Sequence, residues 1–443
     1  MKAGAGKSEI ILTDEYLEIE NFTVIHRALN ARAVAMEDDE GKTFVCLSLE
    51  VTSLPDEETA SLQKEVAKRL NLKDACIWVC VTHTFSAPHL LPDVVLADED
   101  KIREKGVYRE ALGKAALEAA GKALASLEPA EVCFETGLCD ANRNRDVELQ
   151  DGWWVGEGGL GLCDHTVSVI YLKRMDKTPL AVLFHYGVQS SVLDGSKLSA
   201  GGRAITPDLA GIASDYIEKA YKENGAVALF LLGAAGDQCP SEKTVNETFV
   251  QGQRVRRDLQ EEGFGICERL GEKLGSTVCD VIEKIRQKDS GQDMGCKEEK
   301  AENTAGAARK YDSCRILCGK VSFRVPGKEM ERDLKKLHPV KQAEYIPAED
   351  KEAEVEAVCI GGIALLGVKP ELNCCSGLTI GAASPFKETL ICTMVNGAAK
   401  YMADKKSYDR FTYEAINSPF GKGAAEILTR QSAALLESLK KTV

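Results

Sequence analysis

Short apolar runs alternate with stretches whose apolar residues recur at helical spacing, an order that is typical of α/β proteins. Continuous apolar runs of strand length, bounded by polar or small residues, predict buried strands. The runs that we expect to form strands are residues 43–49, 76–81, 167–172, 181–184, 226–232, 363–366 and 390–395. The pattern therefore predicts the α/β fold class.

Three stretches repeat their apolar residues with the period of an amphipathic helix. We expect the first helix to follow a cap at Ser53 and the second, Ala-rich one to end before Pro129. The third helix closes the chain. The apolar face of the first helix holds Leu62, Val66 and Leu70, that of the second holds Leu117, Ala120, Leu124 and Leu127, and that of the third holds Leu428, Leu435 and Leu439.

Residues 286–313 are polar, rich in Lys, Glu and Gly, and almost free of large apolar side chains. This composition predicts an exposed loop or insertion, which could separate two subdomains. We favour an excursion within one domain spanning residues 1–443, because the strand at 363–366 is followed at once by a polar loop, as the earlier strands are.

Composition and charge narrow the possible functions. A chain of 443 residues with 44% hydrophobic residues can bury a large core, and its net charge of −13 repels nucleic acids and anionic membranes. No window approaches the roughly 18 apolar residues of a membrane span, and MKAGAGKSEI lacks the apolar region of a signal peptide. We expect a soluble, cytoplasmic protein.

Sixteen cysteines are scattered through the chain, several of them inside apolar runs, and no C-x-x-C motif occurs. This usage fits free thiols in a reducing compartment and gives no thiolate zinc knuckle.

Candidate chemistry follows the predicted strands, because active sites of open α/β sheets gather beyond the carboxyl ends of strands. Residues 76–81 run into THTFSAPH, 181–184 into His185, and 226–232 into GAAGDQCP. His83 and His185 each follow a buried strand directly, where they serve either as neutral metal ligands or as structural residues.

Three further motifs carry less weight. AGAGKS near the N-terminus lacks the first glycine and the preceding strand of a phosphate loop, so we expect a flexible terminus. GEGGLGL, residues 156–162, leads into a strand-like run and predicts a loop, not a dinucleotide site. Cys239 could pair with His185 as a thiolate, but a buried, inert cysteine is the simpler interpretation.

Six segments, in order, resemble the catalytic domain of the neutral/alkaline (non-lysosomal) ceramidase family. They are THTFSAPH, the Asn142–Arg143 pair, FHYGVQSSVLD, GAAGDQCP, ALLGVKPEL and the C-terminal NGAAKY with NSPFGKGAAE. The resemblance runs from about residue 25 to about residue 436. It implies a large mixed α/β domain with central β-sheets flanked by helices, and a zinc-dependent amidase activity.

By this resemblance, the zinc ligands fall on His83, His185, Glu371 and Tyr401. Two imidazoles and a carboxylate leave zinc a position for water, whose pKa the metal lowers to about 7. Tyr401 would serve as a fourth ligand, because a neighbouring cation favours phenolate.

The resemblance also implies roles beyond the metal. Tyr413 would donate a hydrogen bond to the oxyanion, and Arg143 would anchor a polar or anionic part of the substrate. Cys239 and Asp237 would line the pocket, although Asp237 more simply holds its glycine-rich turn through backbone amides.

The departures from the family pattern change the expected substrate. Phe85 stands where the family has a second histidine, and Cys239 stands where it has a serine. We expect neither the family's secretion signal nor its C-terminal β-domain in this protein. We therefore expect hydrolysis of a small soluble N-acyl or related compound and not of ceramide. A lactone or ester hydrolase, or a non-catalytic ligand-binding protein, are the alternatives.

Overall fold

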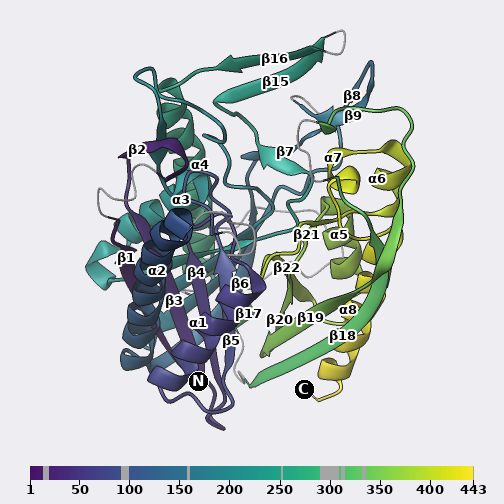
Figure 1. Ribbon diagram of the computed structural model, residues 1–443. Helices are drawn as coiled ribbons and strands as arrows, with labels where there is room; N and C mark the ends of the chain where they lie inside the picture. The colour runs from purple at the N-terminus through teal and green to yellow at the C-terminus, as the bar shows by residue number, and fades with distance from the viewer. Residues whose placement is uncertain are drawn as a thin grey trace, which may run out of the picture.

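Two β-sheets pack face to face between layers of helices in the computed structural model (Figure 1). The structure describes residues 1–12, 19–90, 99–156, 160–250, 253–289, 309–310, 315–331 and 336–442. One buried cluster joins the two sheets, with Phe44, Trp78 and Leu183 from the larger sheet and Val358 and Leu365 from the smaller one. The fold class predicted from the sequence is confirmed.

The larger sheet is mixed, with strands in the order β13-β11-β10-β6-β1-β3-β4-β5 and a short β17 beside β6. Only the β4–β5 and β11–β13 pairs are parallel. The strands are β1 (Lys2–Ile10), β3 (Leu29–Glu37), β4 (Thr43–Leu49), β5 (Cys76–Val81), β6 (Glu128–Leu138), β10 (Thr166–Arg174), β11 (Pro179–Tyr186), β13 (Val227–Leu232) and β17 (Arg309–Lys310).

The smaller sheet has the order β18-β19-β20-β22, and its β20–β22 pair is parallel. Its strands are β18 (Ile316–Lys328), β19 (Pro347–Ile360), β20 (Ile363–Val368) and β22 (Glu388–Thr393). Helices α5 (Cys374–Ala382) and α8 (Ala424–Lys440) cover its outer face, where Ile380 and Leu428 share a core cluster with Leu366.

Four helices cover the outer face of the larger sheet: α1 (Asp56–Arg69), α2 (Glu99–Ala125), α3 (Asp208–Ala220) and α4 (Glu262–Asp289). The remaining elements are short and lie in connections. They are β2 (Phe22–Ile25), β7 (Asn142–Asn144), β8 (Asp146–Leu149), β9 (Gly152–Val155), β12 (Arg203–Ile205), β14 (Gln238–Pro240), β15 (Val245–Val250), β16 (Gln253–Asp258), β21 (Glu371–Leu372), β23 (Tyr401–Met402), α6 (Lys405–Arg410), α7 (Tyr413–Ile416), and the 3-10 turns η2 (Ile19–Asn21) and η4 (Lys222–Asn224).

All seven predicted strands and all three predicted helices are present. The cap predicted at Ser53 is wrong, because α1 begins at Asp56 after Pro55, with no side-chain cap. Proline fits the start of a helix, where its missing N–H has no partner to lose. The polar loop predicted at 286–313 is partly helical, since α4 continues to Asp289, and it also contains β17. Its residues 290–308 and 311–313 lie outside the described part of the chain.

The flexible terminus predicted for AGAGKS is wrong, because these residues form β1 inside the larger sheet. A Cβ at Gly4 would lie 2.1 Å from the Ala123 carbonyl oxygen, and one at Gly6 would lie 2.2 Å from that of Ala119. The glycines therefore let α2 pack directly on the strand, and they serve packing instead of phosphate binding.

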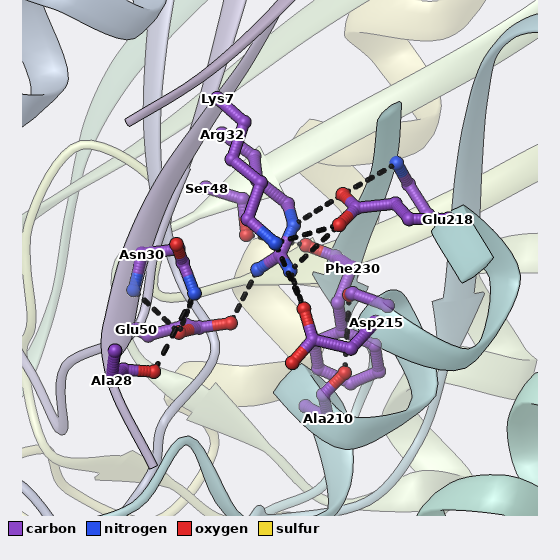
Figure 2. Close-up of polar contacts among 12 residues, drawn as sticks. Lys7, Ala28, Asn30, Arg32, Ser48, Glu50, Ala210, Asp215, Glu218 and Phe230 are labelled. Atoms are coloured by element: carbon purple, nitrogen blue, oxygen red, sulfur yellow. Dashed lines mark hydrogen bonds and ion pairs between the residues drawn. The ribbon is translucent and has the colours of Figure 1, made fainter. Parts of the chain in front are cut away.

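A buried ion cluster fastens α3 to β3 and β1 (Figure 2). The guanidinium of Arg32, which is 2% exposed, contacts the carboxylates of Glu50, Asp215 and Glu218, and Lys7 contacts the latter two. Each buried charge has an opposite partner, which offsets the cost of removing it from water.

Across the described residues, no helix is long and apolar enough to cross a membrane.

Candidate functional site

A cavity of about 340 Å³ lies beyond the ends of several strands, and three of the predicted site residues, Arg143, Tyr401 and Tyr413, line it. Aromatic and cationic side chains dominate its lining. The lining residues are Phe85, Arg143, Arg145, Trp154, Val155, Gly156, Gln189, Asp194, Gly195, Lys243, Val245, Asn246, Glu247, Arg256, Tyr401 and Tyr413. A cavity of this size suits a small ligand.

His83 lies two residues beyond β5, with its backbone in the left-handed region at φ 58°. Its Nδ1 lies 2.6 Å from the carbonyl oxygen of Thr52. A carbonyl only accepts hydrogen bonds, so Nδ1 carries a proton, and Nε2 lies on the side of the ring away from Thr52. Buried Nε2 has no hydrogen-bond partner among the described residues and lies 3.3 Å from a carboxylate oxygen of Glu371.

Glu371 is buried at the start of β21, and it stays ionised. Burial by itself raises its pKa, but His83, Arg145 and a hydrogen bond from Gln189 together hold the pKa below its ordinary value. The amide nitrogen of Gln189 donates to the carboxylate over 2.5 Å. Glu371 therefore presents a negative charge to the His83 ring.

Arg145 holds Gln189 in this orientation. Its Nη1 donates to the Gln189 amide oxygen over 2.6 Å, and its Nε donates to Glu414 over 2.9 Å. The guanidinium lies 5.4 Å from the ring centre of Tyr401 and 5.5 Å from that of Tyr413. The amide of Gln189 is thus fixed with its nitrogen toward Glu371, because its oxygen is committed to Arg145.

The two tyrosines stand together in the cavity wall, with ring centres 5.8 Å apart. Burial raises the pKa of both phenols by more than the neighbouring Arg145 lowers it, so both are protonated at neutral pH when no metal ion is bound. The Tyr413 hydroxyl accepts a hydrogen bond from Asn417 over 3.1 Å, which leaves its own proton available to a ligand.

The structure does not bring His185 to this group. Side chains alternate along β11, where Phe184 and Tyr186 face the helices, so His185 faces the smaller sheet instead. Its Nε2 lies 2.9 Å from the carbonyl oxygen of Ile391, and the ring lines a separate cavity of about 230 Å³. Burial lowers the pKa of His185, so its imidazole is neutral.

Cys239 and Asp237 also lie apart from the cavity lining. Cys239 is buried in β14, opposite Arg143 of β7, and it lines neither the main cavity nor the one beside His185. Asp237 accepts hydrogen bonds from the backbone nitrogen of Cys374, at 2.7 Å, and from the side chain of Asn144, at 3.0 Å. It therefore ties its loop to the start of α5, a backbone-holding role close to the one predicted.

Sequence reasoning missed Arg145 and Gln189. Two arginines two residues apart in ANRNRD can share one face of an extended segment, which is a signal for Arg145 beside the predicted Arg143. Gln189 gave no signal, because β11 ends at Tyr186 and the chain turns before reaching it.

Phe85 occupies the cavity wall beside the His83 ring, with ring centres 4.7 Å apart. Its phenyl group cannot transfer a proton, so any proton delivery in this cavity falls to other groups. The phenol hydroxyls of Tyr401 and Tyr413 line this cavity and can give up a proton.

Within the described residues, no three side chains of His, Cys, Asp or Glu are grouped as a metal site. Two such groups meet, His83 and Glu371, and Tyr401 adds a phenol as the neighbour of Glu371 across β21 and β23. One imidazole nitrogen and one carboxylate are donors that zinc binds, and the phenol oxygen of Tyr401 is the third candidate donor. Gln189 also lies beside Glu371, but its amide nitrogen cannot bind a metal. The candidate set therefore contains one imidazole, that of His83.

The sequence matches no family model and no curated protein. Solved structures are similar in fold. The neutral ceramidase from Pseudomonas aeruginosa has a TM-score of 0.74 at 17% identity, covering 100% of this chain and 75% of that one. A ceramidase complexed with C2 has a TM-score of 0.73 at 15% identity, with the same coverage. This chain therefore has the mixed α/β fold of the neutral ceramidases.

Proposed function

We propose that this protein is a zinc-dependent hydrolase that cleaves the amide bond of a small, soluble N-acyl compound, with zinc held by His83, Glu371 and Tyr401. The observation that carries the proposal is the 3.3 Å approach of His83 Nε2 to the Glu371 carboxylate. An imidazole nitrogen and an ionised carboxylate this close together need a positive species between them, either a proton or a metal ion.

Zinc bound by these groups supplies an activated water and polarises the acyl carbonyl. The chain's own residues would then do the rest. Tyr413 would donate a hydrogen bond from its free hydroxyl to the oxygen that gains charge as the carbonyl becomes tetrahedral. Gln189, fixed by Arg145, would keep the Glu371 carboxylate turned toward His83.

The same groups would act on any acyl centre, so lactones and esters are further candidate substrates. A panel of small amides, lactones and esters separates these classes. A non-catalytic binding protein is the second candidate function, favoured by Phe85 and Gln189, which line the cavity next to the His83–Glu371 pair. Tight ligand binding without product would support it.

We also propose that the protein works in the cytoplasm. Fourteen cysteines within the described residues are free thiols, which a reducing compartment preserves.

Elemental analysis of the untagged protein tests the metal site. We expect near-stoichiometric zinc in the wild type, loss of it in His83→Ala and Glu371→Gln, and full retention in His185→Ala, the matched control. Absence of zinc from the wild type, even after zinc is added back, would remove the hydrolytic proposal. Loss of zinc in His185→Ala with an intact fold would contradict the three-residue ligand set.

A further inference from the structure

We propose that Arg143 forms a carboxylate-binding subsite, and that the substrate is an N-acyl amino acid or a similar acyl amide with a free carboxylate. The inference rests on the proposed function for the bond that is cleaved. The subsite itself rests on the charges that line the cavity.

Arg143 comes from β7 and lines the same cavity as Phe85, Tyr401 and Tyr413. It forms no ion pair with any described residue, and its buried Nε has no hydrogen-bond partner there. Arg143 is half-buried, and its Nε is buried without a partner, which is costly for a charged group. An anion bound in the cavity would supply the missing partner.

The other cations of the cavity already have partners. Arg145 pairs with Glu414 at 2.7 Å, and Lys243 lies 3.9 Å from Asp194. Arg256 lies 3.7 Å from Glu247. The cavity therefore has one cation without a carboxylate of its own, inside a protein whose net charge is −13.

A single unmatched positive charge suits a monoanion better than a dianion such as phosphate. The planar fork of a guanidinium also matches the two oxygens of a carboxylate. The aromatic side chains of Phe85, Trp154 and Tyr413 line the same cavity and would pack against an apolar substituent. These features together describe an N-acyl amino acid with an apolar side chain.

Calorimetric titration with a matched pair of probes tests the subsite. N-methanesulfonyl-L-phenylalanine and its carboxamide differ only in the terminal charge, and a sulfonamide replaces the bond to be cleaved. We expect the carboxylate to bind wild-type protein at least about tenfold more tightly than the carboxamide. In Arg143→Gln this preference should fall to within about twofold, with the carboxamide affinity unchanged.

Arg256→Gln is the matched control, because it removes the same charge from the same cavity at a cation that already has partners. It should keep the preference, and Arg143→Lys should keep part of it. Equal affinity of the two probes for wild-type protein, or equal losses in both glutamine variants, would overturn the subsite. Displacement of the carboxylate probe by millimolar inorganic phosphate would overturn the assignment to monoanions.

Turnover of N-acetyl-L-phenylalanine against its carboxamide separates the two proposals. Carboxylate preference in binding without any product would leave the subsite standing and remove the hydrolase. Hydrolysis of both acetyl compounds at equal kcat/KM would leave the hydrolase standing and remove the subsite.

Discussion

Glu371 and Tyr401 are register partners in the parallel pairing of β21 with β23. Partners in a β-ladder project their side chains to the same side, so this short pairing delivers a carboxylate and a phenol to one point. The backbone nitrogen of Glu371 also donates to the carbonyl of Lys400 over 2.8 Å. The pairing places two of the three proposed zinc ligands before any metal is bound.

The two tyrosines should be separable by mutation. Tyr413→Phe should lower kcat on an amide substrate by about a hundredfold, because it removes the oxyanion donor, while zinc content stays unchanged. Tyr401→Phe should lower zinc affinity instead. Steady-state kinetics and elemental analysis of both variants check this, and zinc loss in Tyr413→Phe would contradict the assigned roles.

Gln189→His should strengthen metal binding. The Gln189 amide nitrogen, which points at Glu371, cannot bind a metal, whereas an imidazole in its place adds a second nitrogen ligand. We expect the dissociation constant for zinc to fall by about tenfold or more. Competition with a chelator measures it, and unchanged affinity would argue that Gln189 does not face the metal.

Gly6→Ala should destabilise the fold, because its Cβ would lie 2.2 Å from the Ala119 carbonyl oxygen and force α2 away from β1. We expect a loss of about 2 kcal/mol in the free energy of unfolding. Gly113→Ala within α2 is the control. Its Cβ meets nothing within 4 Å, so it should stabilise the helix by about 0.5–1 kcal/mol. Urea denaturation compares the two variants.

Arg32→Met should cost about 3–5 kcal/mol, because it leaves the buried Glu50 carboxylate without its cation. Lys7→Met removes a more exposed cation from the same cluster and should cost about 1 kcal/mol or less. Denaturant unfolding of both variants tests the difference. Similar losses would show that burial does not set the strength of this cluster.

Lys328 should make stability depend on alkaline pH. Burial lowers its pKa to about 8 in the folded protein, against about 10.4 in the unfolded chain. Between these values the unfolded chain binds more protons, so the free energy of unfolding should rise from about pH 8 to about pH 10. Lys328→Met should lack this rise and be more stable than the wild type at pH 7, which thermal unfolding in matched buffers would show.

The sequence predicts this fold well wherever an apolar run is buried on both faces. The predicted strand at 43–49 has the same limits in the structure, because only Ser48 interrupts the apolar residues that follow Thr43. Residues 2–10 escaped prediction, since Gly, Ala and Lys do not read as a strand and only the approach of α2 explains the glycines. Local pattern carries no information about such a distant partner.

Only part of the candidate site could be predicted from the sequence, because local pattern does not reveal where a side chain points. His83, Glu371 and Tyr401 come together as the resemblance implied, but His185 does not, because strand alternation turns it toward the smaller sheet. Gln189, and not His185, lies beside Glu371. A histidine at the end of a strand indicates a position along the chain, and only the direction of its side chain decides whether it joins a site.

The proposed ligands belong to different sheets, since His83 follows β5 of the larger one and Glu371 follows β20 of the smaller one. A cation bound by both residues would therefore link the two sheets to each other. Its binding free energy would add to the stability of the whole fold against unfolding. Metal supply would then affect the lifetime of the protein as well as its rate of catalysis.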